Sequence, residues 1–122
     1  GQPDFGVLAM VETMERVNNI VAAVTVPVVA DMETGYGNAL NVMRTVRECV
    51  AAGAAGIILE DQMWPKKCGH FEGKRVIAAE DHAAKLRAAI EARGDAPLSI
   101  NGASCGKPAA FGSRVAATTS TA

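Results

Sequence analysis

The segment from Glu60 to His70 carries the residue types of an active site. Two carboxylates, Glu60 and Asp61, follow directly on the apolar run Gly56–Leu59, and a loop with two lysines, Cys68 and a histidine comes next. Acids rarely end a buried strand, because an unpaired buried charge is costly. Cationic neighbours lower the pKa of a thiol and favour the reactive thiolate. The pattern therefore predicts a reactive thiol beside a carboxylate site.

A second apolar run, Val24–Ala30, also ends in acids and is followed by the flexible turn Gly35–Gly37. If the two runs are neighbouring parallel strands, their acids meet at one edge of the sheet. Mg²⁺ takes one or two carboxylates directly and keeps several of its waters. We expect Asp31 to bind Mg²⁺ directly, and three further acids to hold the coordinated waters: Asp4, Glu33 and Glu60.

These residues also have plainer interpretations. The acids could be solvated strand ends, or they could pair with Arg44 or Lys85. Cys68 could be a small buried hydrophobe, and Lys66 and His70 could be solvated surface residues. A zinc site is not expected, because the cysteine and the histidine lie too close in sequence for a usual ligand pair.

Composition excludes several classes of protein. The chain has 12 basic and 13 acidic side chains, so nothing predicts binding to nucleic acid or to an anionic membrane. Three cysteines without zinc spacing suit a reducing cytoplasm better than a disulfide framework. The longest apolar stretch, Ile20–Ala30, is interrupted by Pro27 and is too short to span a bilayer. We therefore expect a cytoplasmic protein with neither nucleic acid nor membrane as a partner.

Apolar residues recur at steps of three and four in three segments, which predicts three helices that each pack one stripe on a sheet. Glycines at 53 and 94 fall where helix C-caps are expected. Short continuous apolar runs between the helices predict strands buried on both faces. The expected helices are Met10–Val21, Leu40–Val50 and Ala79–Ile90; the expected strands are Val24–Ala30, Gly56–Leu59 and, more weakly, Leu98–Ile100.

Alternating helices and strands imply parallel pairing through right-handed crossovers. The acids at 4, 31 and 60 recur at nearly equal spacing, close to the roughly 31 residues per unit of a (β/α)₈ barrel. A doubly wound sheet would usually have a Gly-rich phosphate turn after its first strand, and none is present. We expect an α/β fold, part of a (β/α)₈ TIM barrel comprising about strands three to five, since 122 residues supply only about half of a barrel.

The end of the chain differs in composition. Residues 97–122 contain no acid and finish in an Ala/Ser/Thr-rich run. We expect residues 1–96 to form the partial barrel domain and residues 97–122 to be a low-complexity or non-native, poorly ordered tail. A shifted reading frame or an artificial terminus near Ala96 would explain the change.

Five segments together have a recognisable pattern: Asp31–Asn38, Arg44–Val46, Gly53–Gly56, Glu60–Gln62 and Lys66–His70. They resemble the isocitrate lyase/phosphoenolpyruvate mutase superfamily, and the similarity runs from about Gln2 to Asp95. The short members of the superfamily are most similar: 2-methylisocitrate lyase, 2,3-dimethylmalate lyase, oxaloacetate hydrolase and carboxyphosphonoenolpyruvate phosphonomutase.

The resemblance implies a (β/α)₈ barrel that binds Mg²⁺, with Mn²⁺ as the alternative ion, and a small-molecule carboxylate substrate. It also implies that the full-length protein is a homotetramer with a swapped helix. Matched by position, Asp31 is the direct metal ligand, and the other three acids complete the site. Cys68 is the catalytic acid, and Lys66 and His70 lie in the same closing loop. The residues expected to approach the substrate are Tyr36, Gly37 and Gly69.

This chain departs from the family pattern at two places. The family usually has Asp where this chain has Glu33, so one extra methylene must be accommodated. The family's fifth strand ends in a segment whose Arg grips the substrate, whereas Ile100–Cys105 contains no Arg.

The resemblance implies Mg²⁺-dependent cleavage of a C–C bond in a 2-hydroxy, methyl-branched di- or tricarboxylate, such as 2-methylisocitrate or dimethylmalate, by retro-aldol chemistry. The alternatives are a carboxyphosphonoenolpyruvate-type phosphonomutase and an oxaloacetate hydrolase. A third expectation is that these 122 residues alone are an inactive, poorly folded fragment, because the barrel is not closed.

Overall fold

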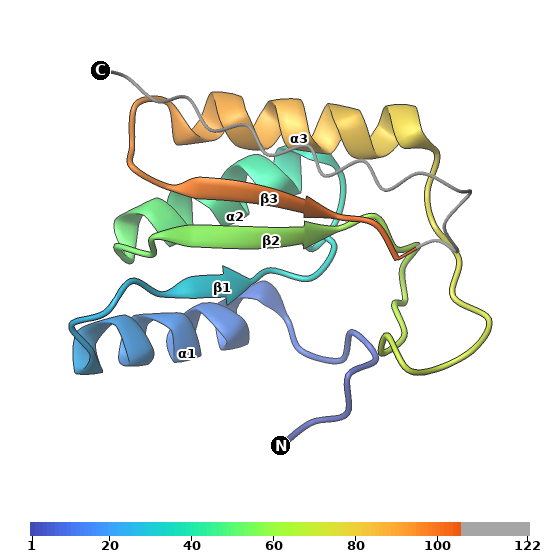
Figure 1. Ribbon diagram of the computed structural model, residues 1–122, viewed down its shortest axis with the longest axis horizontal. Coiled ribbons are helices and arrows are strands. Elements are labelled where there is room, and N and C mark those ends of the chain that lie inside the picture. Colours follow the sequence, from blue (N-terminus) through green and yellow to red (C-terminus); the bar gives the residue numbers. More distant parts are fainter. Residues whose placement is uncertain (106–122) are drawn as a thin grey trace.

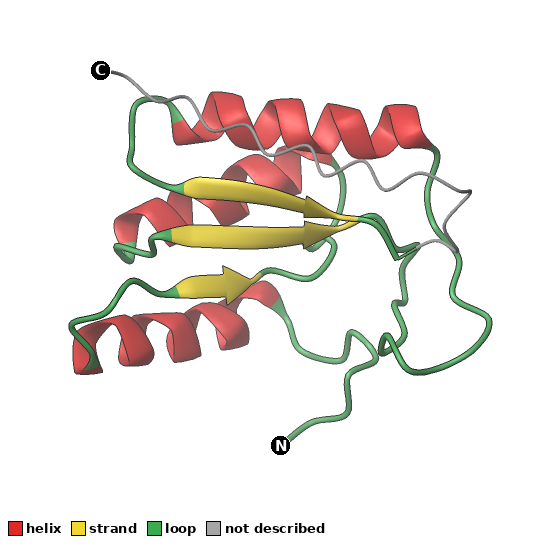
Figure 2. Cartoon of the chain, in the orientation of Figure 1, coloured by secondary structure: helices red, strands yellow, loops and turns green. Residues whose placement is uncertain are grey.

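Helices and strands alternate along the chain, as the sequence predicts. The computed structural model describes residues 1–105. Figure 1 shows the arrangement of the elements, and Figure 2 shows the loops that join them. In order, the elements are α1 (Met10–Ala23), β1 (Val29–Asp31), α2 (Ala39–Ala51), β2 (Gly56–Glu60), α3 (Ala79–Arg93) and β3 (Ser99–Ala103).

The three strands form one parallel sheet in the order β1-β2-β3. In its register, Asp31 lies opposite Ile58 and Ile58 lies opposite Asn101. Alternate strand residues, such as Ile57 and Leu59, join a single core with side chains from all three helices. The helices therefore cover the same face of the sheet. Sequential strand order with helices on one face is the winding of a barrel, because a doubly wound sheet has helices on both faces.

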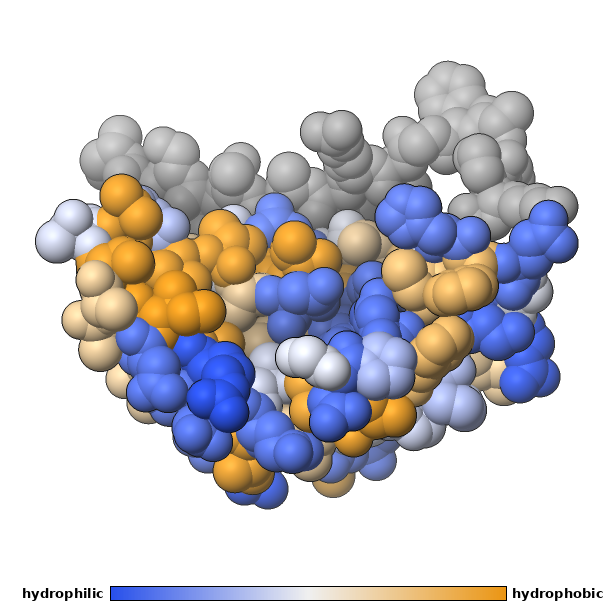
Figure 3. All heavy atoms as spheres, turned by 90° about the horizontal axis from the view of Figure 1, so that it is seen from below, coloured by the Kyte–Doolittle hydropathy of each residue, from blue (hydrophilic) through white to orange (hydrophobic). Residues whose placement is uncertain are grey.

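The other face of the sheet carries no helix in the described residues. Val29 in β1 is 54% exposed, and Asn101 in β3 is exposed as well. Seen from the side of α1, apolar atoms gather at the left end of the molecule (Figure 3), where α1 ends and β1 begins. The exposed apolar side chains of this region are Ile20, Val24, Val26 and Val29. Every helix in the part of the chain described here is too short or too polar to cross a bilayer.

Local sequence explains where α2 begins and ends. The Asn38 side chain accepts hydrogen bonds from the backbone N–H groups of Leu40 and Asn41, and the Asn41 side chain accepts one from the N–H of Asn38. This reciprocal cap satisfies N–H groups that have no partner within the helix. Gly53, with φ +77°, follows the C-cap residue Ala52. The glycine expected to end this helix is thus confirmed, and so is Gly94, which caps α3 with φ +55°.

The first strand is shorter than predicted. β1 begins only at Val29, whereas the apolar run predicted a strand from Val24. Pro27 has no N–H to donate to a neighbouring strand, and β1 lies at the edge of the described sheet. The pairing begins instead at Val28, whose carbonyl accepts from the N–H groups of Ala55 and Gly56.

The expected boundary at residue 96 also requires correction. β3, at Ser99–Ala103, lies beyond this boundary and pairs with β2 along its whole length. The regular structure therefore extends at least to Ala103. Polar and small residues hide the strand, because Asn101 and Gly102 interrupt its apolar pattern. The part of the expected tail at residues 106–122 lies outside the described residues.

Two glycines with positive φ provide a test of local packing. A Cβ at Gly35 would overlap the Cγ2 atom of the buried residue Val42, whereas a Cβ at Gly94 would meet no atom within 4 Å. We expect Gly94→Ala to lower the free energy of unfolding by about 1–2 kcal/mol, because φ +55° and ψ −131° are angles that alanine rarely adopts. Gly35→Ala should lower it by roughly 3 kcal/mol, because overpacking adds to that cost. Urea unfolding of both variants in the complete gene product checks this; equal losses would contradict the packing at Gly35.

Candidate active site

Three of the four predicted metal-binding acids gather around one ammonium group. The Nζ atom of Lys66 lies 2.8 Å from Oδ1 of Asp4 and 3.6 Å from Oε2 of Glu60, and it also forms an ion pair with Oε2 of Glu33. Glu60 ends β2, Glu33 follows β1, Asp4 comes from the N-terminal segment, and Lys66 comes from the loop after β2. In Figure 2 these segments meet beyond the arrowheads of the strands, at the carboxyl edge of the sheet.

The charges of this acid cluster, Asp4, Glu33 and Glu60 with Lys66, depend on one another. Burial opposes the charged form of Lys66, but the hydrogen bonds to Asp4 and Glu33 outweigh this and raise the pKa of Lys66 above its usual range. The hydrogen bond with Lys66 lowers the pKa of Asp4. Burial raises the pKa of Glu33, against the opposing effect of Lys66. The cluster therefore holds a buried cation whose charge the acids stabilise.

The salt bridges considered as a plainer interpretation of the acids do not form. Lys85 donates instead to the carbonyl oxygen of Thr34 at 3.0 Å, and Arg44 lies 4.0 Å from Glu48 within α2. Asp61 is also separate from the acid cluster. Its carboxylate accepts from the Ser104 hydroxyl at 2.6 Å and from the N–H of Cys105 at 2.8 Å, so it ties the end of β2 to the end of β3.

Asp31 lies apart from Lys66. Its Oδ1 atom accepts a hydrogen bond from the N–H of Glu33 at 2.9 Å. Glu33 has a left-handed backbone with φ +57°, and its carbonyl accepts from the N–H of Glu60 at 2.7 Å. A left-handed residue other than glycine is uncommon and costs free energy, so its surroundings must hold it. These two hydrogen bonds fix the backbone from which the Glu33 side chain reaches Lys66.

The predicted thiol lies close to its predicted neighbour. The Sγ atom of Cys68 lies 3.6 Å from Nδ1 of His70. Cys68 lies close enough to Asp4 to add, after Lys66, to the lowering of the pKa of that carboxyl, so the thiol lies at the margin of the acid cluster. Both residues belong to the thiol loop, which we define as residues 61–78 between β2 and α3. The loop therefore delivers Lys66 into the cluster and Cys68 to its margin.

Gln62 connects the acid cluster to the thiol loop, and sequence reasoning gave it no role. Its Nε2 atom donates to Oε2 of Glu60 and to the carbonyl of Lys67, both at 2.9 Å, and its Oε1 atom accepts from the N–H of Lys67 at 3.0 Å. The residue is only 2% exposed. The position of Gln62 directly after two strand-end acids could have indicated this role, because a buried amide there must form hydrogen bonds.

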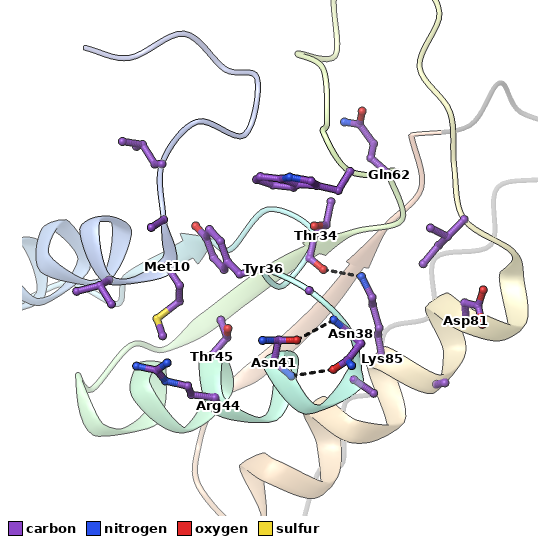
Figure 4. A pocket seen from close by; sticks show the side chains of 18 residues that line it. Met10, Thr34, Tyr36, Asn38, Asn41, Arg44, Thr45, Gln62, Asp81 and Lys85 are labelled. Atoms are coloured by element: carbon purple, nitrogen blue, oxygen red, sulfur yellow. Dashed lines mark hydrogen bonds between the residues drawn. The ribbon is translucent and has the colours of Figure 1, made fainter.

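Figure 4 shows a cavity of about 970 Å³ and the side chains that line it. It lies between the start of α1, the start of α2 and α3, and Tyr36, Gly37, Gln62 and Trp64 line part of it. Of the residues expected to approach the substrate, Tyr36 and Gly37 line this cavity. Gly69 does not, nor do the acid cluster, Asp31, Cys68 and His70. Gln62, which lines the cavity and binds Glu60, is the direct link between the two parts.

Tyr36 is anchored in this cavity wall. Its hydroxyl donates to Oγ1 of Thr13 in α1 at 2.8 Å, and its backbone is left-handed with φ +61°. Burial raises the pKa of its phenol to about 12, and the nearby charges of Glu33 and Asp31 act in the same direction. The neutral phenol is thus the form that the fold favours.

The donor set fits a hard divalent cation, although the side chains are not arranged to hold one. Among residues 1–105, no group of three or more His, Cys, Asp and Glu side chains could hold a metal ion as it stands. The cluster nevertheless consists of carboxylate oxygens, the ligands that Mg²⁺ prefers. Oε2 of Glu33 is buried and has no partner besides the ion pair with Lys66. An oxygen in this position is suited to a cation.

The phenol of Tyr36 gives a prediction on pH. We expect it to ionise with a midpoint near pH 12, against 10.0 for an ordinary tyrosine. Because the folded state favours the protonated form, this contribution to stability is complete below pH 10 and is lost as the pH rises to about 12. The phenolate absorbance of the complete gene product, minus that of Tyr36→Phe, isolates this group. A difference midpoint at 10 would contradict the burial of the phenol.

Comparison with known proteins identifies the fold and the family. The family model described as phosphoenolpyruvate phosphomutase matches residues 1–103. The chain is 55% identical over 96 residues to carboxyvinyl-carboxyphosphonate phosphorylmutase, chloroplastic, of Arabidopsis thaliana, covering 78% of this chain and 28% of the relative. It is also 55% identical over 93 residues to 2,3-dimethylmalate lyase of Eubacterium barkeri, covering 76% of this chain and 32% of the relative.

A solved structure of 2,3-dimethylmalate lyase, a member of the PEP mutase/isocitrate lyase superfamily, superposes with a TM-score of 0.83 and 30% identity. The match covers 86% of this chain and 36% of that protein. A phosphonopyruvate hydrolase solved with oxalate and Mg²⁺ gives a TM-score of 0.73 and 33% identity, and the match covers 84% of this chain and 34% of that protein.

The chain spans about a third of the length of these relatives. With its parallel sheet, sequential strand order and helices on one face, it forms part of a TIM barrel, as predicted. The chain belongs to the phosphoenolpyruvate phosphomutase family, within the PEP mutase/isocitrate lyase superfamily.

Proposed function

We propose that the protein containing this chain is a Mg²⁺-dependent carbon–carbon lyase that cleaves a 2-hydroxy, methyl-branched di- or tricarboxylate. The observation that carries the proposal is the convergence of three strand-end and loop carboxylates beside the Cys68–His70 pair. Relatives named 2,3-dimethylmalate lyase and 2-methylisocitrate lyase, 55% and 50% identical, support this substrate class.

The acids at the carboxyl edge of the sheet would hold the cation. In this proposal Asp31 is its direct ligand, and Asp4, Glu33 and Glu60 bind its water molecules. Mg²⁺ bound by these acids, or Mn²⁺ in its place, would supply Lewis-acid stabilisation of the negative charge that develops on the substrate oxygens. The Mg²⁺ and oxalate in the solved phosphonopyruvate hydrolase support this choice of ion and of ligand class.

Cys68 is proposed as the general acid. In a retro-aldol cleavage the substrate hydroxyl would give its proton to a carboxylate of the acid cluster, the C–C bond would break, and the electron pair would stay on the carbon of the departing carboxylate fragment. The thiol of Cys68 then gives its proton to that carbon. His70, with Nδ1 3.6 Å from the sulfur, orients the thiol. Tyr36 and Gly37 form the side of the cavity on which the rest of the substrate would bind.

A phosphonomutase is the second candidate function. The 55% identity to carboxyvinyl-carboxyphosphonate phosphorylmutase favours it, and an oxaloacetate hydrolase follows from the likeness to oxaloacetate acetylhydrolase, at 31% identity and a TM-score of 0.82. The thiol beside the acid cluster favours a lyase, because carbanion protonation needs a proton donor there.

This chain also departs from the family pattern at a position that bears on activity. At the end of β3, where the family pattern places a substrate-binding Arg, the structure has Ala103, followed by Ser104, whose hydroxyl donates to Oδ2 of Asp61 at 2.6 Å. No arginine lies within the segment that forms this end of the sheet, residues 99–105. We therefore propose that residues 1–122 alone are inactive. The homotetramer and the cytoplasmic location expected from the sequence stay predictions.

A substrate panel separates the candidate functions. We expect the complete gene product to cleave 2-methylisocitrate or dimethylmalate, and to lose this activity on treatment with EDTA and recover it with MgCl₂. Product analysis by mass spectrometry reports the cleavage. Turnover of phosphonopyruvate or carboxyphosphonoenolpyruvate without lyase turnover would support the phosphonomutase instead, and oxaloacetate hydrolysis alone would support the hydrolase.

The role of Cys68 has its own test. Cys68→Ser should lower the turnover number about a hundredfold or more, because a serine hydroxyl is a much weaker acid than a thiol. Mg²⁺ binding, followed by calorimetry, should be unchanged. Cys105→Ser is the matched control, since Cys105 bonds Asp61 through its backbone N–H, which serine retains. Unchanged turnover of the Cys68 variant would remove the thiol from the mechanism.

A further inference from the structure

We infer that Lys66 is a tethered cation that competes with the divalent cation for the acid cluster, so that cation binding releases Lys66 and the thiol loop. The inference rests on the proposed metal site at Asp4, Glu33 and Glu60. It adds a function for Lys66 beyond that of a loop residue beside the thiol.

The first step is that Lys66 and the divalent cation need the same space. The ammonium group contacts Oδ1 of Asp4, Oε2 of Glu33 and Oε2 of Glu60. The proposed role of these three acids is to bind the waters around the cation. Those waters would have to lie next to the oxygens that Lys66 contacts, and two cations within one cluster repel each other. The two states therefore exclude one another.

The second step is that this lysine is unusually well placed to compete. Its side chain is only 3% exposed, whereas lysines are almost never buried without partners. Glu33 makes the shortest of the three ion-pair contacts, and its side chain is partly buried. The extra methylene of Glu33, relative to the Asp of the family pattern, extends its carboxylate toward the ammonium group. Glu33, which departs from the family pattern, therefore strengthens the competition of Lys66 with the divalent cation.

The third step connects the cluster to the chemistry. Lys66 lies two residues before Cys68, and the adjoining Lys67 backbone is held by Gln62, which also bonds Glu60. Two attachments thus fix the start of the thiol loop at the cluster: the Lys66 ion pairs and the Gln62 hydrogen bonds. When cation binding breaks the Lys66 ion pairs, the hydrogen bonds of the Gln62 side chain still hold this point of the loop. The loop can then move with its thiol over the cavity when substrate binds.

Calorimetric titration with MgCl₂ alone, and with MnCl₂ alone, tests the competition in the complete gene product. Lys66→Met should bind either ion about tenfold more tightly than the wild type, because the competing charge is gone. Lys67→Met is the matched control: it removes the same charge from the adjacent residue, whose ammonium group lies near Gly73, outside the cluster. Its affinity should stay within about twofold. Equal affinities of the wild type and Lys66→Met would overturn the inference and leave the metal site standing, whereas no binding by any of the three proteins would overturn both.

Acylation of lysine amines, read by mass spectrometry, tests the release of Lys66 in the wild-type protein, which avoids any defect in folding. Lys66 should react slowly without added ions, and about tenfold faster in saturating MgCl₂. Lys67 is the internal reference, and choline chloride at equal ionic strength controls for screening. In a protein that calorimetry shows to bind Mg²⁺, a Lys66 amine equally protected in both solutions would overturn the inference, because the cation would then bind without displacing it.

Discussion

The site depends on the gathering of like charges from separate segments around a single buried cation. Parallel pairing brings Glu33 beside Glu60, since the N–H of Glu60 bonds the carbonyl of Glu33. The carboxylates of Glu33 and Glu60 repel each other and lose solvation, and Asp4 adds a third negative charge. The ammonium group of Lys66 offsets this repulsion and loss of solvation. The acids in turn stabilise its charge in a buried position. These ion pairs therefore position the thiol loop and the strand ends together.

The barrel winding explains why the acids meet at all. In a parallel sheet every strand ends at the same edge, and in barrels the loops beyond that edge build the site. The register places Asp31 level with Ile58 and Asn101 on the face that the helices leave open. In a closed barrel this face is the interior. The 54% exposure of Val29 follows from the same arrangement, because no helix of the described residues covers this face.

Periodicity alone predicted the helices well and the strands less well. Each helix has an apolar stripe whose spacing depends only on local geometry, so α1, α2 and α3 begin at or near the expected residues. The predicted start of β1 was wrong because the apolar run continues through Pro27, whose backbone cannot donate a hydrogen bond. β3 was underestimated because its polar residue, Asn101, faces the open side and bonds the neighbouring strand. The apolar pattern of a segment indicates which side chains are buried, whereas a strand forms wherever its backbone finds a hydrogen-bonding partner.

The candidate site was predictable in its residue types but not in its pairings. Spacing indicated that acids would collect at the sheet edge and that Lys66 would lie near Cys68, and both are so. It could not indicate which acids take the ammonium group, because that depends on how the thiol loop folds back. It also could not indicate that Asp31 would bond the N–H of Glu33, a contact that needs the left-handed turn at Glu33.

The same turn explains how a longer acid fits at position 33. A left-handed backbone at Glu33 directs its carbonyl to β2, where it accepts from Glu60, while its side chain extends to the thiol loop. An aspartate on the same backbone would end one methylene short of Lys66. The glutamate therefore joins the two strand ends through its backbone and the loop through its side chain. This double attachment is a physical reason for the exchange of Asp for Glu in this chain, and it makes the ammonium group, rather than the strand ends alone, the centre of the site.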